Sequence, residues 1–285
     1  MSAVEVTYPE GAVKVLDKGF VRLVDVMGDD SSIVQSARVS YGKGTKSVNE
    51  DEGLIRYLMR HRHTTPFEMV EFKFHCRMPI FVARQWIRHR TANVNEMSAR
   101  YSEMPDLFYL PDADSITTQS AQNKQGGSGV PIENADALVA TFRETQKEAY
   151  ECYEDYLERG MRRELARVNL PISLYTEWYW KIDLHNLLHF LSLRLDKHAQ
   201  FEIRVFAEAM AELVKKYVPL TWKAFEDYNL KGAHFSALEL DLLTAGLNGE
   251  PMDVATRIQN KRERSEFIEK LTALGISKEK FLLGT

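Results

Sequence analysis

The chain has 285 residues, of which 44% are hydrophobic and 27% are charged, as in an ordinary soluble globular protein of one or two domains. Its formal net charge of −4 argues against a general nucleic-acid-binding protein, because that role usually needs a basic surface. Two cysteines offer no disulfide framework, no apolar run is long enough to span a membrane, and Met1–Glu10 lacks the pattern of a secretory signal, so we expect a cytoplasmic protein.

The first part of the chain predicts strands interspersed with helices. An apolar-rich run is followed by acidic and serine residues, Asp29 to Ser31, that can cap a helix. Asn49–Glu52 has the pattern of a capping box, and the acidic start and basic end of the helix that it opens both suit the helix dipole. Alternation of apolar and polar residues predicts a second, half-buried strand. The predicted elements are strand Gly19–Met27, helix Ser32–Ser40, helix Asn49–Arg60 and strand Val70–Arg77.

A helix beginning at Pro79 leads into Arg88–Tyr101, the most informative segment of the sequence. Proline suits the first helical position, because its missing N–H would be unpaired there. We expect Arg88, His89 and Arg90 in the last turn, where cations complement the helix dipole. The planar donor fork of guanidinium suits phosphate, so an anion site is one interpretation. A solvated basic helix end before a polar loop is the other, and the varied composition that follows disfavours it.

The rest of the chain predicts one long loop and several helices. Residues 112–130 are rich in Gly, Ser and Gln, cannot bury apolar area and are predicted to form a mobile loop. No Gly-x-Gly-x-x-Gly or Walker motif is present, so a dinucleotide would have to be held by side chains. The further predicted elements are helix Asn134–Arg159, strand Ile172–Ile182, a leucine-striped helix over Leu184–Leu195, and helices Phe201–Tyr217, Ser236–Leu247 and Asp253–Leu274.

Arg194 is the most informative residue outside the arginine-rich segment. It lies on the flank of the leucine stripe, and His198 is expected within that stripe. A charge near a buried face is costly unless it is paired, so a structural ion pair and a functional role stay equally open from the residues alone. His185 and His189 lie on the opposite face at a spacing that can bind a metal, although such pairs are usually solvated or hydrogen-bonded.

Four motifs, in the same order along the chain, resemble the flavin-dependent (alternative) thymidylate synthase family. They are His61–Glu68, then Arg-His-Arg at 88–90 followed after seven residues by Ser98, then Ala166–Arg167 before Leu170–Pro171, and finally Leu193–Arg194 with His198–Gln200. The resemblance runs from about Leu16 to about Tyr228. It does not obviously include residues 112–134 or the C-terminal end of the chain.

The resemblance implies both an architecture and an activity. The expected fold is α+β, with a mixed sheet flanked by helices in a catalytic domain over residues 1–230, followed by a helical C-terminal extension over residues 231–285. The implied reaction is the reductive methylation of dUMP to dTMP. In this family 5,10-methylenetetrahydrofolate is the carbon donor, NADPH the reductant and FAD the hydride carrier, and the expected assembly is a homotetramer with flavin at the subunit junctions.

Residue roles follow from the same resemblance. Arg194 is the expected catalytic residue, which would contact the uracil ring and favour loss of its N3 proton. The dUMP pocket is expected to comprise Gln85, Trp86, Ile87, Arg88, Glu96, Met97, Ser98, Ala99, Arg100, Arg167 and Arg194. The FAD site is expected to comprise His63, Thr65, Arg88, His89, Arg90, Glu96, Asp183, Leu184, His185 and His189. Family members often carry asparagine and arginine at some of the last positions, and no metal site is expected.

The two cysteines lend no support to a covalent mechanism. Cys76 lies in the alternating strand and Cys152 in a helical run, so both are interpreted as small core residues. We therefore expect a reaction without a cysteine nucleophile.

Two other functions remain open. A non-catalytic nucleic-acid or nucleotide-binding protein could use the arginine-rich segment, but the acidic net charge and the lack of a recognisable nucleic-acid-binding fold count against it. A metalloenzyme could be built on His185, His189 and His198. Flavin colour in the purified protein would separate these alternatives.

Overall fold

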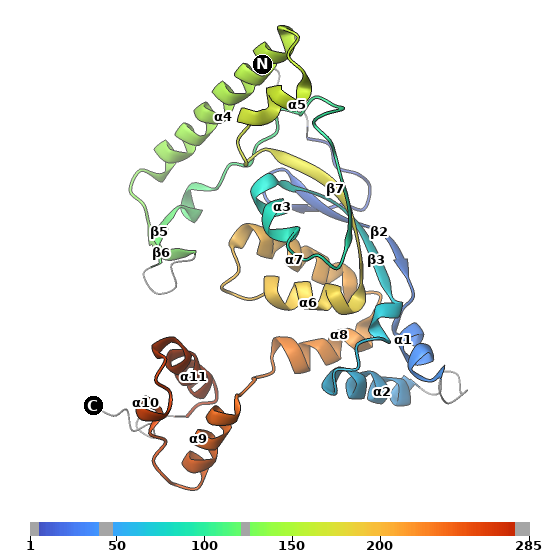
Figure 1. Cartoon of the computed structure of the whole chain (residues 1–285), viewed down its shortest axis with the longest axis vertical. Coiled ribbons are helices and arrows are strands. Elements are labelled where there is room, and N and C mark those ends of the chain that lie inside the picture. The colour runs from blue at the N-terminus through green and yellow to red at the C-terminus, as the bar shows by residue number, and fades with distance from the viewer. Residues whose placement is uncertain (1–5, 40–47, 121–125, 277–285) are drawn as a thin grey trace. The chain divides into compact units, whose positions relative to one another are not determined.

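The computed structural model describes residues 6–39, 48–120 and 126–276 (Figure 1). The chain divides into two compact units, Met1–Phe225 and Glu226–Thr285, whereas the expected boundary lay after residue 230. Among the described residues, no helix combines the length and the apolar character that a membrane crossing requires.

An antiparallel sheet forms the centre of the first unit. Its five strands lie in the order β1-β2-β3-β7-β4. Every pairing between them is antiparallel, so the α+β class is confirmed but the mixture of strand directions that we expected is not found in this sheet. The strands are β1 (Val13–Val15), β2 (Gly19–Met27), β3 (Glu71–Pro79), β4 (Asn93–Glu96) and β7 (Tyr175–Asp183).

Helices cover one face of this sheet. Phe74 and Cys76 of β3 pair in register with Trp180 and Trp178 of β7, so these apolar side chains face the same side. Trp86 packs edge-on against both tryptophans, with ring centroids 5.3 Å apart. The core therefore lies between the sheet and its covering helices, which are α3 (Ile80–Trp86), α6 (Leu184–Arg194) and α7 (Phe201–Val214) (Figure 1).

Helix α1 (Asp30–Ala37) is capped as expected. The carboxylate of Asp29 accepts from the backbone N–H groups of Ser31 and Ser32 at 2.9 and 3.2 Å. The helix ends at Ala37, earlier than expected, and Ser40 lies outside the described residues. The next residue after the cap, the buried Asp30, accepts from the N–H groups at the start of α8 (Pro219–Phe225) and so joins α1 to α8.

Helix α2 (Val48–Arg60) packs against α8. It begins at Val48, so Asn49 lies inside the helix and is not its N-cap, which corrects the expected capping box. The residues before Val48 lie outside the described part of the chain. A turn and the short 3₁₀ helix η2 (Phe67–Met69) then lead into β3.

Helix α3 ends earlier than the sequence predicts. Pro79 is the last residue of β3 and the N-cap of α3, with extended backbone angles, so it stands just outside the helix. Ile87 is the C-cap, and Arg88, His89 and Arg90 follow the helix instead of forming its last turn. The chain leaves the helix here because it must reach β4, which adds to the sheet beside β7.

The region expected to be one mobile loop contains regular structure. It holds the 3₁₀ helix η3 (Ala113–Ser115) and an antiparallel hairpin of β5 (Thr117–Gln119) and β6 (Gly127–Pro131). The glycine content that predicted a loop instead supplies positive φ angles, such as 68° at Gly126. Residues 121–125 lie outside the described residues. The expected long helix follows as α4 (Ala135–Glu158), and then come α5 (Arg163–Ala166) and the 3₁₀ helix η4 (Arg167–Asn169).

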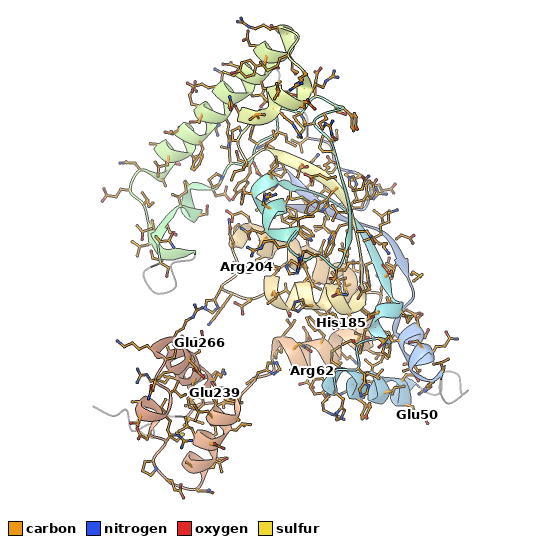
Figure 2. The ribbon with its side chains drawn as sticks, viewed as in Figure 1. Glu50, Arg62, His185, Arg204, Glu239 and Glu266 are labelled. Carbon is orange, nitrogen blue, oxygen red and sulfur yellow. The ribbon has the colours of Figure 1, made fainter. Side chains whose placement is uncertain are left out.

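The second unit is helical, with its own core. The single helix expected over Asp253–Leu274 is wrong, because the chain leaves the helix at Ile258 and Asn260 caps a new one. Ile258 and Phe267 are buried in the core of this unit. Lys270 donates to the carboxylate of the buried Glu239 (labelled in Figure 2) at 2.8 Å. The elements of the second unit are the π-helix η5 (Glu226–Leu230), α9 (Ala237–Leu247), α10 (Val254–Arg257) and α11 (Lys261–Ala273).

Candidate functional site

Helix α6 organises the candidate site. Asp183 caps it, with a side-chain oxygen that accepts from the Asn186 N–H at 2.9 Å. On the polar face, His185 (labelled in Figure 2) is half-buried, and His189 is exposed. The opposite face is buried against the core, as expected, through Leu184, Leu187, Leu188 and Leu191.

Arg194 ends this helix and is held by His89. The Arg194 Nε donates to the His89 Nε2 at 3.2 Å, and both side chains are half-buried. Burial, followed by the charges of Arg194 and His189, lowers the pKa of His89 from 6.5 to about 4. The imidazole is therefore neutral near pH 7, with its proton on Nδ1 and Nε2 as the acceptor. This bond orients the guanidinium and leaves its terminal nitrogens for a ligand.

Arg194 and Arg88 form a pair of like charges. Burial and then the charge of Arg88 lower the pKa of Arg194. In the part of the chain that the structure describes, neither arginine is paired with a carboxylate. Two neighbouring cations without a counter-ion are unfavourable unless an anion joins them. This arrangement favours a binding site over the structural ion pair that the sequence left open for Arg194.

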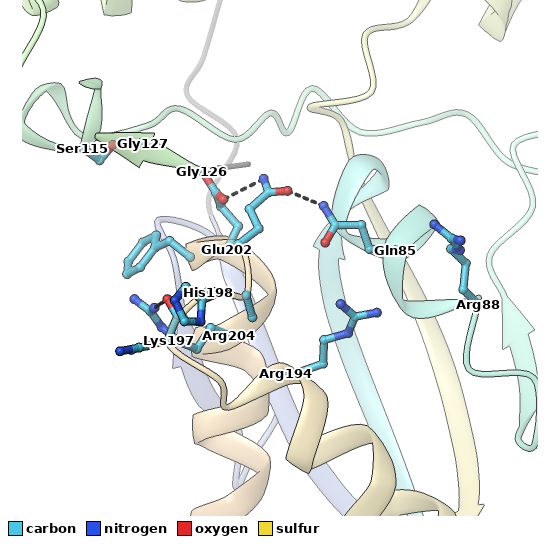
Figure 3. Close-up of a pocket in the computed structure, with 13 residues that line it drawn as sticks. Gln85, Arg88, Ser115, Gly126, Gly127, Arg194, Lys197, His198, Glu202 and Arg204 are labelled. Atoms are coloured by element: carbon cyan, nitrogen blue, oxygen red, sulfur yellow. Dashed lines mark hydrogen bonds between the residues drawn. The ribbon is translucent and has the colours of Figure 1, made fainter. Parts of the chain in front are cut away.

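An open cavity of about 830 Å³ lies beside Arg194 (Figure 3). Gln85 and Arg88 lie at the Arg194 end, and Lys197 and Arg204 lie at the other end. These four Lys and Arg side chains face a single acidic lining residue, Glu202, so the cavity suits a ligand with several negative charges. The remaining lining residues are Ser115, Gly126, Gly127, His198, Ala199, Gln200 and Phe201.

Several of the residues predicted to hold a flavin lie on α6 or beside it. His63 and Thr65, both exposed, precede η2, which packs against α6. The first helical residue, Leu184, donates its N–H to the chain directly after η2 at 2.8 Å. Further along the helix, the rings of His189 and His89 have centroids 6.3 Å apart. The structure thus aligns these residues beside one helix that ends at Arg194.

The residues predicted to hold the nucleotide fall into two groups. Gln85, Arg88 and Arg194 line the cavity, whereas 96–100 and Arg167 do not. Arg167 is exposed at the start of η4. The described cavity therefore holds only part of the predicted nucleotide site.

The second group is held by contacts of its own. Glu96 accepts from the Thr176 hydroxyl at 2.7 Å, which fixes the end of β4 to β7. Arg100 pairs with Glu164 of α5 at 3.4 Å, and its N–H donates to the Ser98 hydroxyl oxygen at 3.3 Å. These contacts place the segment after β4 beside α5.

Three of the predicted contact residues have buried side chains. Trp86 and Leu184 are fully buried and Ala99 is 6% exposed. The indole of Trp86 fills the core between the sheet and the helices, so this side chain does not line the described cavity. The neighbouring Ile87 and Arg90 are exposed, and Met97 is half-buried.

The structure corrects the expectations for the side chains of His198 and Cys152. His198 does not lie in the leucine stripe, because α6 stops at Arg194, and it is exposed in the following turn beside Asp196 at 2.9 Å. Cys76 is buried as expected, but Cys152 is exposed on α4. The described residues contain no group of three or more His, Cys, Asp or Glu side chains that could hold a metal, so they give the metalloenzyme alternative no site.

Among the charged residues that line the cavity, sequence reasoning missed Lys197, Glu202 and Arg204. They surround the His198–Gln200 motif at the turn between α6 and α7. The signal that the sequence offered for these residues was the concentration of charged side chains around that motif. The pattern alone did not show that this turn faces Gln85, which is distant in the sequence.

The fold and the site define an α+β protein with a cationic cavity that suits an anionic ligand. A family model described as thymidylate synthase complementing protein matches residues 22–220. A flavin-dependent thymidylate synthase of Rickettsia conorii is 54% identical over 90% of this chain and 92% of its own length. One from Gluconobacter oxydans is 55% identical over 89% of this chain and 85% of its own length. The chain belongs to the flavin-dependent thymidylate synthase family, as its motifs predicted.

A solved structure agrees with this assignment. The UMP/dUMP methylase PolB from Streptomyces cacaoi, crystallised with 5-Br dUMP, is 35% identical with a TM-score of 0.69. The match covers 98% of PolB but 76% of this chain. The curated relatives leave only about a tenth of the chain unmatched, less than the length of the second unit, so part of that unit has a counterpart in them.

Proposed function

We propose that the protein is an FAD-dependent thymidylate synthase that converts dUMP to dTMP, with 5,10-methylenetetrahydrofolate as carbon donor and NADPH as reductant. The observation that carries the proposal is Arg194, held by neutral His89 and placed beside Arg88 on a cationic cavity. Membership of the family and the dUMP analogue in the PolB crystal support it.

The residues along α6 fit a flavin dinucleotide. His63, Thr65 and His189 offer exposed polar groups, and Arg88 and Arg90 offer cations for a pyrophosphate without a glycine-rich loop. When bound, FAD would supply hydride transfer. In this proposal the chain itself orients the flavin by side chains from α6 and from the two turns beside it.

Arg194 would act on the base of dUMP. A fixed cation beside the uracil ring stabilises the negative charge that develops when the N3 proton leaves. His89 holds the guanidinium in place, because a neutral imidazole accepts the Arg194 Nε–H. Cys76 has no exposed surface and Cys152 does not line the cavity, which supports activation without a cysteine nucleophile.

We also propose that the pocket is completed between subunits of a homotetramer. Residues 96–100 and Arg167 lie outside the cavity of their own chain, so a second copy can bring them to Arg194. The second unit is helical and has a core of its own, and we propose that its role lies in stability or assembly.

The test of this function is a flavin spectrum followed by product analysis. Purified protein should bind FAD, the flavin absorption should bleach with NADPH, and dTMP should form from dUMP and methylenetetrahydrofolate. If saturating FAD gives no binding signal by calorimetry or fluorescence, the proposal fails. A colourless, nucleotide-binding protein without turnover would favour the non-catalytic alternative.

A further inference from the structure

Arg62, which is labelled in Figure 2, has a backbone conformation that arginine rarely adopts. Its φ angle is 57°, in the left-handed region, just after the end of α2. The Arg62 N–H donates to the Met59 carbonyl at 3.2 Å, and the His63 N–H donates to the Leu58 carbonyl at 2.9 Å. These two hydrogen bonds form a Schellman motif, which usually has glycine at the left-handed position because a side chain there is strained. The fold of this turn therefore gives no reason for an arginine.

The side chain of Arg62 is available to a ligand. It is exposed, and within the described ranges it has no ion pair or side-chain hydrogen bond. Three exposed rings belong to the same segment. The ring centroids of Tyr57 and His63 are 5.8 Å apart in a stacked arrangement, and those of Tyr57 and His61 are 4.5 Å apart. A guanidinium fork suits phosphate and an aromatic face suits a planar base, so this turn offers both kinds of group that bind a nucleotide.

This turn is connected to the end of α6 that is opposite to Arg194. The segment leads into η2, and the residue directly after η2, Val70, accepts the N–H of Leu184 at the start of α6. The helix has 11 residues, so its two ends are roughly 16 Å apart. In the proposed function dUMP lies at the Arg194 end, and the residues that hold the flavin lie along the helix. A ligand at Arg62 can therefore approach the flavin without taking the place of dUMP.

We propose that Arg62 binds the 2′-phosphate of NADPH and that the rings of the same turn stack with its adenine. The inference rests on the proposed function, in which NADPH reduces the flavin. In adenosine 2′-phosphate one ribose carries both the base and the phosphate, which suits a turn that carries both the rings and the arginine. The carboxylates of a folate are separated from its pterin by an aminobenzoyl group, so a folate fits this arrangement less well. Arg62 thus selects NADPH over NADH, which lacks this phosphate.

The test measures the bleaching of bound FAD in the full-length protein by anaerobic stopped-flow absorption, without dUMP or folate. Wild-type protein should bind NADPH about tenfold or more tightly than NADH, because the arginine forms charge-assisted hydrogen bonds with the additional phosphate. Arg62→Gly keeps the backbone of the turn but removes the guanidinium. Its Kd for NADPH should rise by the same factor. Its Kd for NADH, its limiting rate of bleaching and its affinity for FAD should stay unchanged.

Stability separates this role from a structural one. Glycine adopts the left-handed conformation freely, so Arg62→Gly should have the same Tm as the wild type or a higher one. Two controls should leave both Kd values unchanged. Asn134→Gly changes another left-handed residue (φ 59°) without loss of charge, and Arg159→Ala removes an exposed arginine of another element. If Arg62→Gly does not fold, Arg62→Asn replaces it, because asparagine also tolerates this conformation, and it should raise the NADPH Kd in the same way.

An unchanged Kd for NADPH in a folded variant overturns the inference. A parallel rise of the two Kd values also overturns it, because it indicates a structural role, and a loss of FAD affinity overturns it by assigning Arg62 to the flavin. Wild-type protein whose flavin is bleached equally well by NADPH and NADH overturns this inference alone. Wild-type protein that binds no FAD, or whose FAD neither nucleotide bleaches, overturns the proposed function as well.

Discussion

Replacing Arg194 by alanine removes the cation on which the proposed chemistry depends. The side chain is half-buried, and its Nε donates a hydrogen bond to His89. This bond restricts the orientation of the guanidinium and of its terminal nitrogens. Removing one such donor from the site of developing charge typically costs about 10²–10³ in rate. We expect dTMP formation by Arg194→Ala to fall by that factor in a steady-state assay, while bound FAD is retained.

The same variant has a second readout that does not depend on turnover. After burial, the charge of Arg194 is the next cause of the lowered pKa of His89. Without that charge the pKa of His89 should rise above about 4, yet stay below 6.5, because burial and His189 still act on it. Side-chain NMR titration of His89 in the two proteins measures this change directly.

The control is Arg159→Ala, which removes the exposed arginine at the C-cap of α4, whose ion pair among the described residues is with Asp155. Its turnover and the His89 titration should match those of the wild type. Wild-type turnover in folded, FAD-loaded Arg194→Ala would remove Arg194 from the mechanism. An unchanged His89 pKa in that variant would refute the contact between the two side chains.

Three further predictions concern other parts of the molecule. The double variant Cys76→Ala, Cys152→Ser should keep most of its turnover, and complete loss in a folded, flavin-loaded sample would restore a cysteine nucleophile. The pKa of His89 is about 4 in the folded chain and ordinarily 6.5, so the unfolded chain takes up the proton first as the pH falls, and the stability in urea should decrease between about pH 6.5 and 4. The decrease should be smaller in His89→Gln. An equal dependence of stability on pH in the two proteins would contradict this prediction. Phe267→Ala deletes a fully buried ring of the second unit and should destabilise that unit by about 3–5 kcal/mol, while the affinity for FAD is kept. If the first unit stays folded but FAD binding is lost, the second unit takes part in the site.

The sequence predicted those elements that local patterns determine. The leucine stripe of α6, the alternation in β3 and the long α4 are all periodic, and each lies close to its expected range. The cap of α1 was also visible, since Asp29 accepts from backbone N–H groups a few residues away, whereas the capping box expected at Asn49 was wrong. The arginine-rich segment and Arg194 were also identified, because motifs in the chain carried them.

Features decided by distant contacts were not visible in the sequence. Nothing local showed that α3 stops before Arg88, because the chain leaves it to pair β4 with a strand that comes much later. Trp86 lies beside a binding motif in the sequence, but its indole is buried in the core. This burial depends on packing against β7 and α6, which the local sequence does not show. The cavity brings Gln85 to Gln200 across the fold, so this contact could not be predicted either.

The central claim is that this chain binds FAD and uses it to make dTMP from dUMP. The most direct test mixes purified, FAD-loaded protein with dUMP, methylenetetrahydrofolate and NADPH, and follows dTMP by chromatography together with the flavin absorption. Matched samples omit one component each. The account predicts dTMP only in the complete mixture and bleaching of the flavin when NADPH is added. A folded, FAD-loaded protein that forms no dTMP in the complete mixture would contradict it.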